Sequence, residues 1–133
     1  MAIRLRDSAF KCLFTEVKKF HLRPVKKLSF QFDPFHENAK SVRDFLFHIS
    51  TRRIRKTSDI CIIKTDVVND RSEPTINVEL TNGLHILFKC ANLSTLDVAR
   101  EYNKLMDKYD VQEEESTLKL KGALQKDYSK KKK

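Results

Sequence analysis

The sequence predicts an α/β protein built on a four-stranded mixed sheet. A strand pattern, a helix pattern and a second strand pattern follow one another over residues 25–68, which is typical of a β-α-β unit. The dipeptide Asn82-Gly83 separates two alternating apolar segments and predicts a β-hairpin over 75–89. A further helical pattern follows the hairpin. The length of 133 residues suits one domain with a substantial core.

The N-terminal segment predicts an amphipathic basic helix that ends near His21. Its apolar residues recur at helical spacing and are Phe10, Leu13, Phe14, Val17 and Phe20. Mitochondrial targeting segments share this amphipathic basic character, although acidic residues such as Glu16 weaken the match. The pattern leaves open whether the helix docks on a partner or packs on the core of its own chain.

The β-α-β unit begins with a half-buried strand over 25–32, where Leu28, Phe30 and Phe32 share one face. Asp33-Pro34 ends that strand, and apolar spacing predicts a helix over 38–49. We expect residues 51–58 to form a basic loop. Residues 59–68 read as a second strand with apolar residues on both faces, which is typical of the centre of a sheet and of parallel pairing.

The last ordered element is predicted to be a second helix of the sheet domain. Ser94 is its expected N-cap, and Asp97 stands at the third helical position, where an acid favours the positive end of a helix. Residues 111–133 lack strong apolar periodicity and end in four lysines. We expect this tail to be mobile or bound to a partner.

The order of elements matches a minimal thioredoxin-like arrangement. A dithiol of that fold would lie between the first strand and its helix, but this chain has Asp33-Pro34-Phe35-His36 there and no cysteine. Dithiol exchange is therefore chemically absent at this place, and His36 is expected to act as a polar cap. Pro74 precedes the hairpin, where such folds often place a cis proline, and it is a candidate for one.

Composition excludes several other classes of protein. No apolar segment approaches the length of a membrane span, and the 2 glycines cannot build a phosphate-binding loop. The spacing of the 4 histidines matches no zinc motif, and the 3 cysteines form no C-x-x-C pair. We therefore predict no enzymatic activity, no cofactor and no metal.

Charge is the strongest functional signal in the sequence. The formal net charge is +9, with +9 in residues 1–57, −3 in residues 58–112 and +3 in residues 113–133. This asymmetry favours a polyanionic partner, because clustered Arg and Lys contact phosphates without reading sequence. The candidate RNA- or partner-binding residues are Arg23, Lys26, Lys27, Arg52, Arg53, Arg55, Lys56, Lys130, Lys131, Lys132 and Lys133.

The chain also resembles one family over about residues 21–106, through the order and spacing of several short segments. These segments are His21-Leu22-Arg23-Pro24-Val25-Lys26, Phe32-Asp33-Pro34-Phe35, Asn38, Ser41-Val42-Arg43, Asp70-Arg71-Ser72-Glu73-Pro74, Asn82-Gly83 and Ala91-Asn92-Leu93-Ser94-Thr95-Leu96. They resemble the mitochondrion-specific large-subunit ribosomal protein numbered fifty-three. The resemblance implies a thioredoxin-like fold without catalysis, as a structural constituent of the mitochondrial ribosome in the matrix.

The resemblance also implies partners and a place. The partners would be the mitochondrial large-subunit rRNA and neighbouring ribosomal proteins near the base of the stalk that recruits translation factors, with no membrane and no small-molecule substrate. The expected organisation is an N-terminal helix over 1–21, a thioredoxin-like domain over 22–110 and a charged tail over 111–133. Two alternatives remain at this point: a thiol or glutathione oxidoreductase, and an accessory subunit of a respiratory complex.

Overall fold

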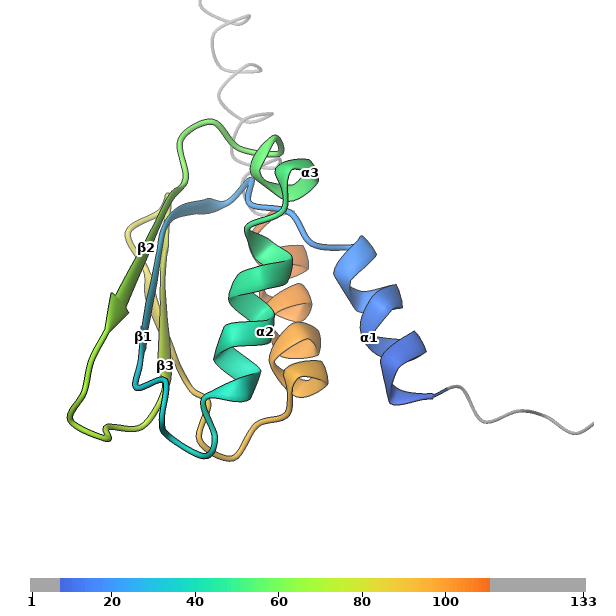
Figure 1. The fold of residues 1–133 in the computed structure, drawn as a ribbon. Helices are drawn as coiled ribbons and strands as arrows, with labels where there is room; N and C mark the ends of the chain where they lie inside the picture. The colour runs from blue at the N-terminus through green and yellow to red at the C-terminus, as the bar shows by residue number, and fades with distance from the viewer. Residues whose placement is uncertain (1–7, 111–133) are drawn as a thin grey trace, which may run out of the picture.

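The computed structural model describes residues 8–110, and the predictions for the tail 111–133, including Lys130–Lys133, lie outside the described residues. The sheet has four strands. Its helices lie on one face, as Figure 1 shows. A final helix runs through residues 95–110. The elements before it are α1 (Ala9–Lys18), β1 (Val25–Phe32), α2 (Lys40–Ile49), α3 (Arg52–Arg55), β2 (Ile62–Val67), β3 (Thr75–Leu80) and β4 (His85–Lys89).

The sheet has the strand order β2-β1-β3-β4. β1 pairs with β2 in parallel, and the pairs β1–β3 and β3–β4 are antiparallel. The predicted β-α-β unit and the hairpin are therefore confirmed. Gly83 has a φ of 85°, which is the left-handed conformation that a tight hairpin turn requires and that favours glycine.

The core lies between the sheet and the helices. The register of β1 and β3 shifts between Val25 and Lys27, and this irregularity lets both Val25 and Leu28 point into the core. Three aromatic rings, Phe20, Phe45 and Tyr102, meet edge to face with centroids 5.2–5.5 Å apart. The Tyr102 hydroxyl donates to the carbonyl of His21 at 2.9 Å, and burial raises the pKa of this phenol. The core thus joins the segment before β1 to the last helix.

The last helix begins as predicted. The backbone N–H of Asp97 donates to Ser94 Oγ at 3.3 Å, and the N–H of Ser94 donates to Asp97 Oδ2 at 3.2 Å. This reciprocal pair satisfies two donors at the helix start, where no intrahelical partner exists. The Ser94 hydroxyl and backbone hydrogen bonds lower the pKa of the Asp97 carboxyl.

One expectation about the elements was wrong, and two questions that the sequence left open are answered. β2 is an edge strand with exposed side chains rather than the two-sided central strand that its apolar sequence predicts. Phe10 and Phe14 of α1 point to solvent, because the helix meets the core through Leu13 and Val17 instead. Pro74 follows a trans bond, since residues 8–110 contain no cis peptide.

No helix within the described part of the chain is both long and apolar enough to cross a membrane. Within the same residues, no cluster of three or more His, Cys, Asp or Glu side chains could hold a metal ion.

Candidate nucleic-acid interface

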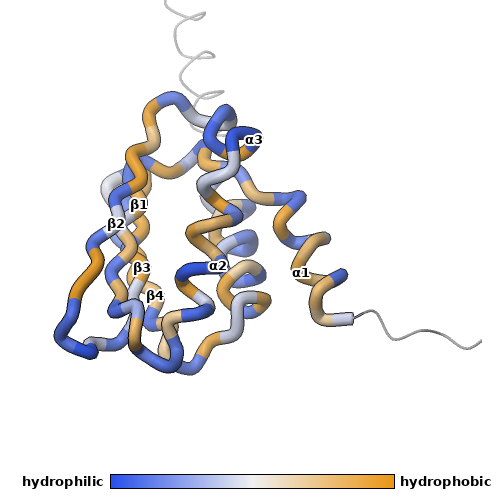
Figure 2. The backbone as a smooth tube through the Cα atoms, in the orientation of Figure 1, coloured by the Kyte–Doolittle hydropathy of each residue, from blue (hydrophilic) through white to orange (hydrophobic). Residues whose placement is uncertain are grey.

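The predicted basic loop contains a short helix, α3. α2 ends at Ile49, and the extended backbone of Thr51 starts a new turn, whose four residues are Arg-Arg-Ile-Arg. The turn forms because Ile54 is buried to 1% exposure in the core, while the residues around it stay polar. Figure 2 shows α3 as a mostly hydrophilic segment. One apolar residue inside a basic run is the signal that could have predicted this turn.

Arg53 has a structural contact. Its Nη2 donates to the carbonyl oxygen of Val17 at 3.1 Å, in the last turn of α1. The Val17 carbonyl also accepts the N–H of Phe20 at 3.2 Å, so the guanidinium is a further donor at this helix end, where a positive charge complements the helix dipole. Arg53 therefore attaches α1 to α3.

The other three cations of this segment are Arg52, Arg55 and Lys56, and all of them are exposed. None forms an ion pair with a carboxylate of the described residues. Their positive charge is therefore directed to solvent and is available to an external anion. We call Arg52, Arg55 and Lys56 the α3 cations.

The second basic set, near the start of β1, is largely neutralised. Lys26 Nζ lies 3.0 Å from Glu79 Oε1, and this hydrogen bond is the main reason that the pKa of Glu79 is lowered. Lys27 lies opposite Glu79 in the register of β1 and β3. Arg23 Nη2 lies 3.4 Å from Asp110 Oδ2, although its side chain remains 58% exposed.

A hydrogen bond joins the two basic segments. The N–H of Leu22 donates to Thr57 Oγ1 at 2.9 Å, and the Thr57 hydroxyl donates to the carbonyl of Ile54. The start of β1 and α3 accordingly lie at the same end of the molecule (Figure 1). We call this end of the molecule, which carries the α3 cations, the cationic end.

The junction between β1 and α2 holds a structural carboxylate. Asp33 is fully buried, and its two oxygens accept the N–H groups of Phe35 and Arg71, each at 2.9 Å. Arg71 has a φ of 54°, so Asp33 supports a strained turn 38 residues away. The Nδ1 atom of His36 accepts the N–H of Asn38 at 3.1 Å, which is the capping role expected for it.

Burial makes two of the cysteines, Cys61 and Cys90, poor sources of a reactive thiolate. Burial raises the pKa of the Cys90 thiol to about 11. Burial also raises the pKa of Cys61, although the nearby Arg55 charge opposes that effect. Thiols with raised pKa values are poor nucleophiles at neutral pH, since the thiolate is the reactive form.

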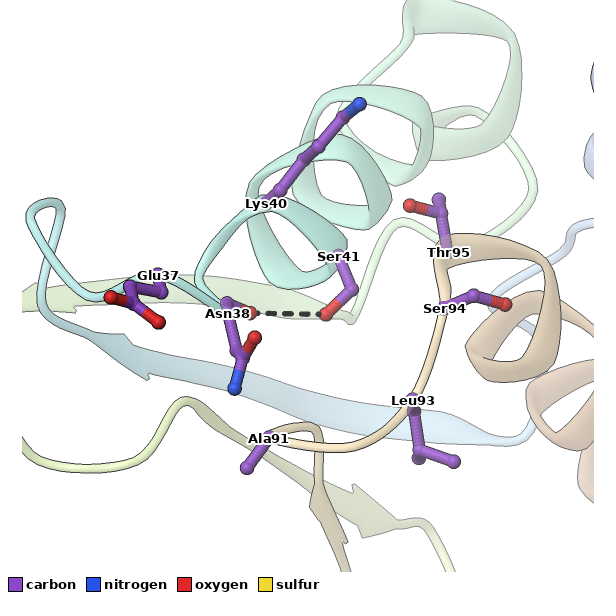
Figure 3. Close-up of a pocket in the computed structure, with 8 residues that line it drawn as sticks. All are labelled: Glu37, Asn38, Lys40, Ser41, Ala91, Leu93, Ser94 and Thr95. Atoms are coloured by element: carbon purple, nitrogen blue, oxygen red, sulfur yellow. Dashed lines mark hydrogen bonds between the residues drawn. The ribbon is translucent and has the colours of Figure 1, made fainter.

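An open pocket of about 270 Å³ lies between the first turns of α2 and of the last helix (Figure 3). The hydroxyl of Ser41 lies within hydrogen-bond distance of the carbonyls of Asn38 and Cys90, at 3.5 and 3.4 Å. No base is paired with a nucleophile in its lining. The lining residues are Glu37, Asn38, Lys40, Ser41, Ala91, Leu93, Ser94 and Thr95.

Fold and site together define a small basic α/β protein that carries a set of exposed cations at one end. A family model described as 39S ribosomal protein L53/MRP-L53 matches residues 32–83. The large ribosomal subunit protein mL53 of Dictyostelium discoideum is 25% identical over 104 residues, which cover 78% of this chain and 81% of the relative. Over these residues the chain is similar to the mitochondrial ribosomal protein L53 (mL53) family of large-subunit ribosomal proteins.

Proposed function

We propose that this chain is a structural constituent of the mitochondrial large ribosomal subunit that contacts rRNA through its cationic end. The observation that carries the proposal is the set of α3 cations, which stay exposed and without carboxylate partners in residues 8–110. Phosphate contacts from Arg and Lys fix the position of a protein on RNA without reading base sequence. The resemblance to the family supports large-subunit rRNA as the polyanion.

The anchoring of α3 supports this role. The buried Ile54, the Arg53 contact to α1 and the Thr57 hydrogen bonds hold the turn in place before any RNA is bound. A pre-organised site loses less conformational entropy on binding than a mobile basic loop would. The α3 cations can therefore bind phosphates at a fixed spacing.

Two finer assignments belong to the same proposal. The strand order β2-β1-β3-β4, with β3 antiparallel to its neighbours, supports a thioredoxin-like architecture that has lost its thiol chemistry. The resemblance to the family supports a position near the base of the factor-recruiting stalk, among neighbouring ribosomal proteins. We also propose that the chain divides into an N-terminal helix over 1–21, a sheet domain over 22–110 and a charged tail over 111–133. In the tail, the proposed further RNA contacts are Lys130, Lys131, Lys132 and Lys133.

Charge reversal tests the rRNA contact. Tagged full-length chain is expressed in mitochondria, and the fraction that sediments with large subunits is measured at rising KCl. The triple variant R52E/R55E/K56E is expected to lose association by about tenfold or more near 150 mM salt, because each lost phosphate contact weakens binding and reduces its salt dependence. Arg53 is left intact because it attaches α1.

The matched control reverses three exposed cations away from α3, in the variant K40E/R43E/K89E. It changes the net charge by the same amount and is expected to associate like the wild-type chain. Wild-type association of R52E/R55E/K56E, or equal loss in both variants, would contradict a contact through α3.

A further inference from the structure

β2 has the sequence of an interior strand but lies at the edge of the sheet. Four of its six residues are β-branched, and none is Gly or Pro. Ile62 is 63% exposed, and Ile60, just before the strand, is 72% exposed. Apolar side chains in such a pattern are stable when both faces and both edges of a strand are covered. Within residues 8–110, nothing covers the outer edge of β2.

The backbone of that edge is open to a further strand. The N–H of Val68 donates to the carbonyl of Phe32 at 3.1 Å, so it points toward β1. Backbone groups of a strand alternate in direction, and the N–H groups of Ile63, Thr65 and Val67 therefore point away from β1. They form a row of donors and acceptors that a sheet would pair.

β2 also lacks the usual protection of an exposed edge. Natural edge strands are commonly guarded by Lys, Pro or a bulge. The lysine here, Lys64, lies 3.3 Å from Asp66 on the same strand, so the edge carries little net charge. β2 pairs with β1 in a regular register over residues 62–67, so no bulge interrupts this strand.

We propose that the outer edge of β2 receives an extended, uncharged, β-branched or apolar segment of a neighbouring ribosomal protein as a fifth strand. This inference rests on the proposed function. The lack of net charge disfavours RNA at this edge and fits a neutral protein segment. A six-residue edge is about 20 Å long and buries far less than the ~1,200 Å² of a stable free interface. It therefore suits a partner already held nearby in the particle rather than a second free copy.

Amide hydrogen exchange tests this proposal on the full chain, free in solution and in isolated mitochondrial large subunits. The outward amides of Ile63, Thr65 and Val67 are expected to exchange at least about tenfold more slowly in the particle than in the free chain. The outward amides of β4 serve as an internal comparison. Protection that appears in the free chain as its concentration rises, or on protein-free rRNA, would assign the edge to a second copy or to RNA and overturn the proposal.

The two proposals fail in different ways. A chain that does not sediment with large subunits contradicts the proposed function and this inference together. A chain that is present in the particle, but whose β2 amides exchange at the free-chain rate, contradicts the fifth strand alone.

A pair of proline variants sharpens the test. T65P removes an outward N–H and leaves the bonds to β1 in place, so in the particle Ile63 and Val67 should return to the free-chain rate. The control L87P makes the same change on β4, where Cys90 N–H donates to Pro74 O at 3.0 Å and Leu87 therefore points outward. L87P should keep the protection of β2, and protection retained by T65P overturns the proposal.

If T65P does not fold, I62K replaces it. The side chain of Ile62 is largely exposed, so lysine is compatible with the free fold. It places a charge in the apolar contact with the added strand and should abolish the protection. Unchanged protection in a folded I62K variant contradicts the proposal.

Discussion

Two cationic segments of this chain, residues 23–27 and residues 52–56, differ in where their charges are directed. Lys26 is paired with Glu79, and Arg23 lies beside Asp110. The α3 cations have no such carboxylates within the described residues, and only Arg53 contacts another element. Similar composition therefore gives one segment that stabilises the fold and one that offers charge to a partner, because neighbouring acids decide how much charge remains free.

The largest expected effect comes from removing the anchor of α3. I54A should destabilise the protein by about 2–4 kcal/mol, since it deletes a fully buried side chain and leaves a cavity. Urea denaturation followed by circular dichroism measures the change. A loss well below 1 kcal/mol would mean that α3 is not held by the core.

A smaller loss is expected where α1 meets the last helix. Asn103 Nδ2 donates to Glu16 Oε2 at 2.8 Å and to the Glu16 carbonyl at 3.0 Å, and this side chain is the main cause of the lowered pKa of Glu16. N103A should cost about 1–3 kcal/mol at pH 7.

The stability difference between N103A and wild type is expected to depend on pH. Because the pKa of Glu16 is lower in the folded state, its stabilisation is present above the unfolded pKa of roughly 4.3 and is lost as the pH falls through the folded value. Denaturation at pH 7 and pH 3 should therefore show the difference between N103A and wild type narrowing at the acidic pH. A constant difference would show that the hydrogen bond to the Glu16 carboxylate does not contribute to stability.

Arg52 and Arg53 provide the sharpest contrast between a free and a bound cation. R53A should lower stability by up to about 1 kcal/mol, because it removes the hydrogen bond to α1. R52A should leave the melting temperature unchanged and weaken association with large subunits. Thermal melts and sedimentation of both variants separate the two roles, and the reverse pattern would contradict the assignment.

The smallest effect is expected in the paired segment. K26A should raise the pKa of Glu79 toward its ordinary value and leave association with large subunits unchanged, because Lys26 already interacts with a carboxylate. NMR titration of the Glu79 side chain measures the pKa. Weakened association would show that Lys26 also contacts rRNA.

Local patterns predicted the hairpin, the capped last helix and the strand over 25–32, because turn chemistry and alternation act between near neighbours. They could not predict that β2 lies at an edge. Apolar residues on both faces say that a strand should be covered, but not by which element or by which chain. The same limit applies to Phe10 and Phe14, which fit the periodicity of α1 and nevertheless face solvent.

The sequence by itself determined the α/β class, the order of strands and helices along the chain, the absence of a dithiol at Asp33-Pro34-Phe35-His36 and the net positive charge. Only the tertiary structure decided which cations stay free, because Glu79 and Asp110 approach their partners from segments more than 50 residues away. It likewise turned Asp33 into the buried support of the Arg71 turn. Composition records how many charges a chain has, whereas the pairing of those charges depends on contacts that exist only after folding.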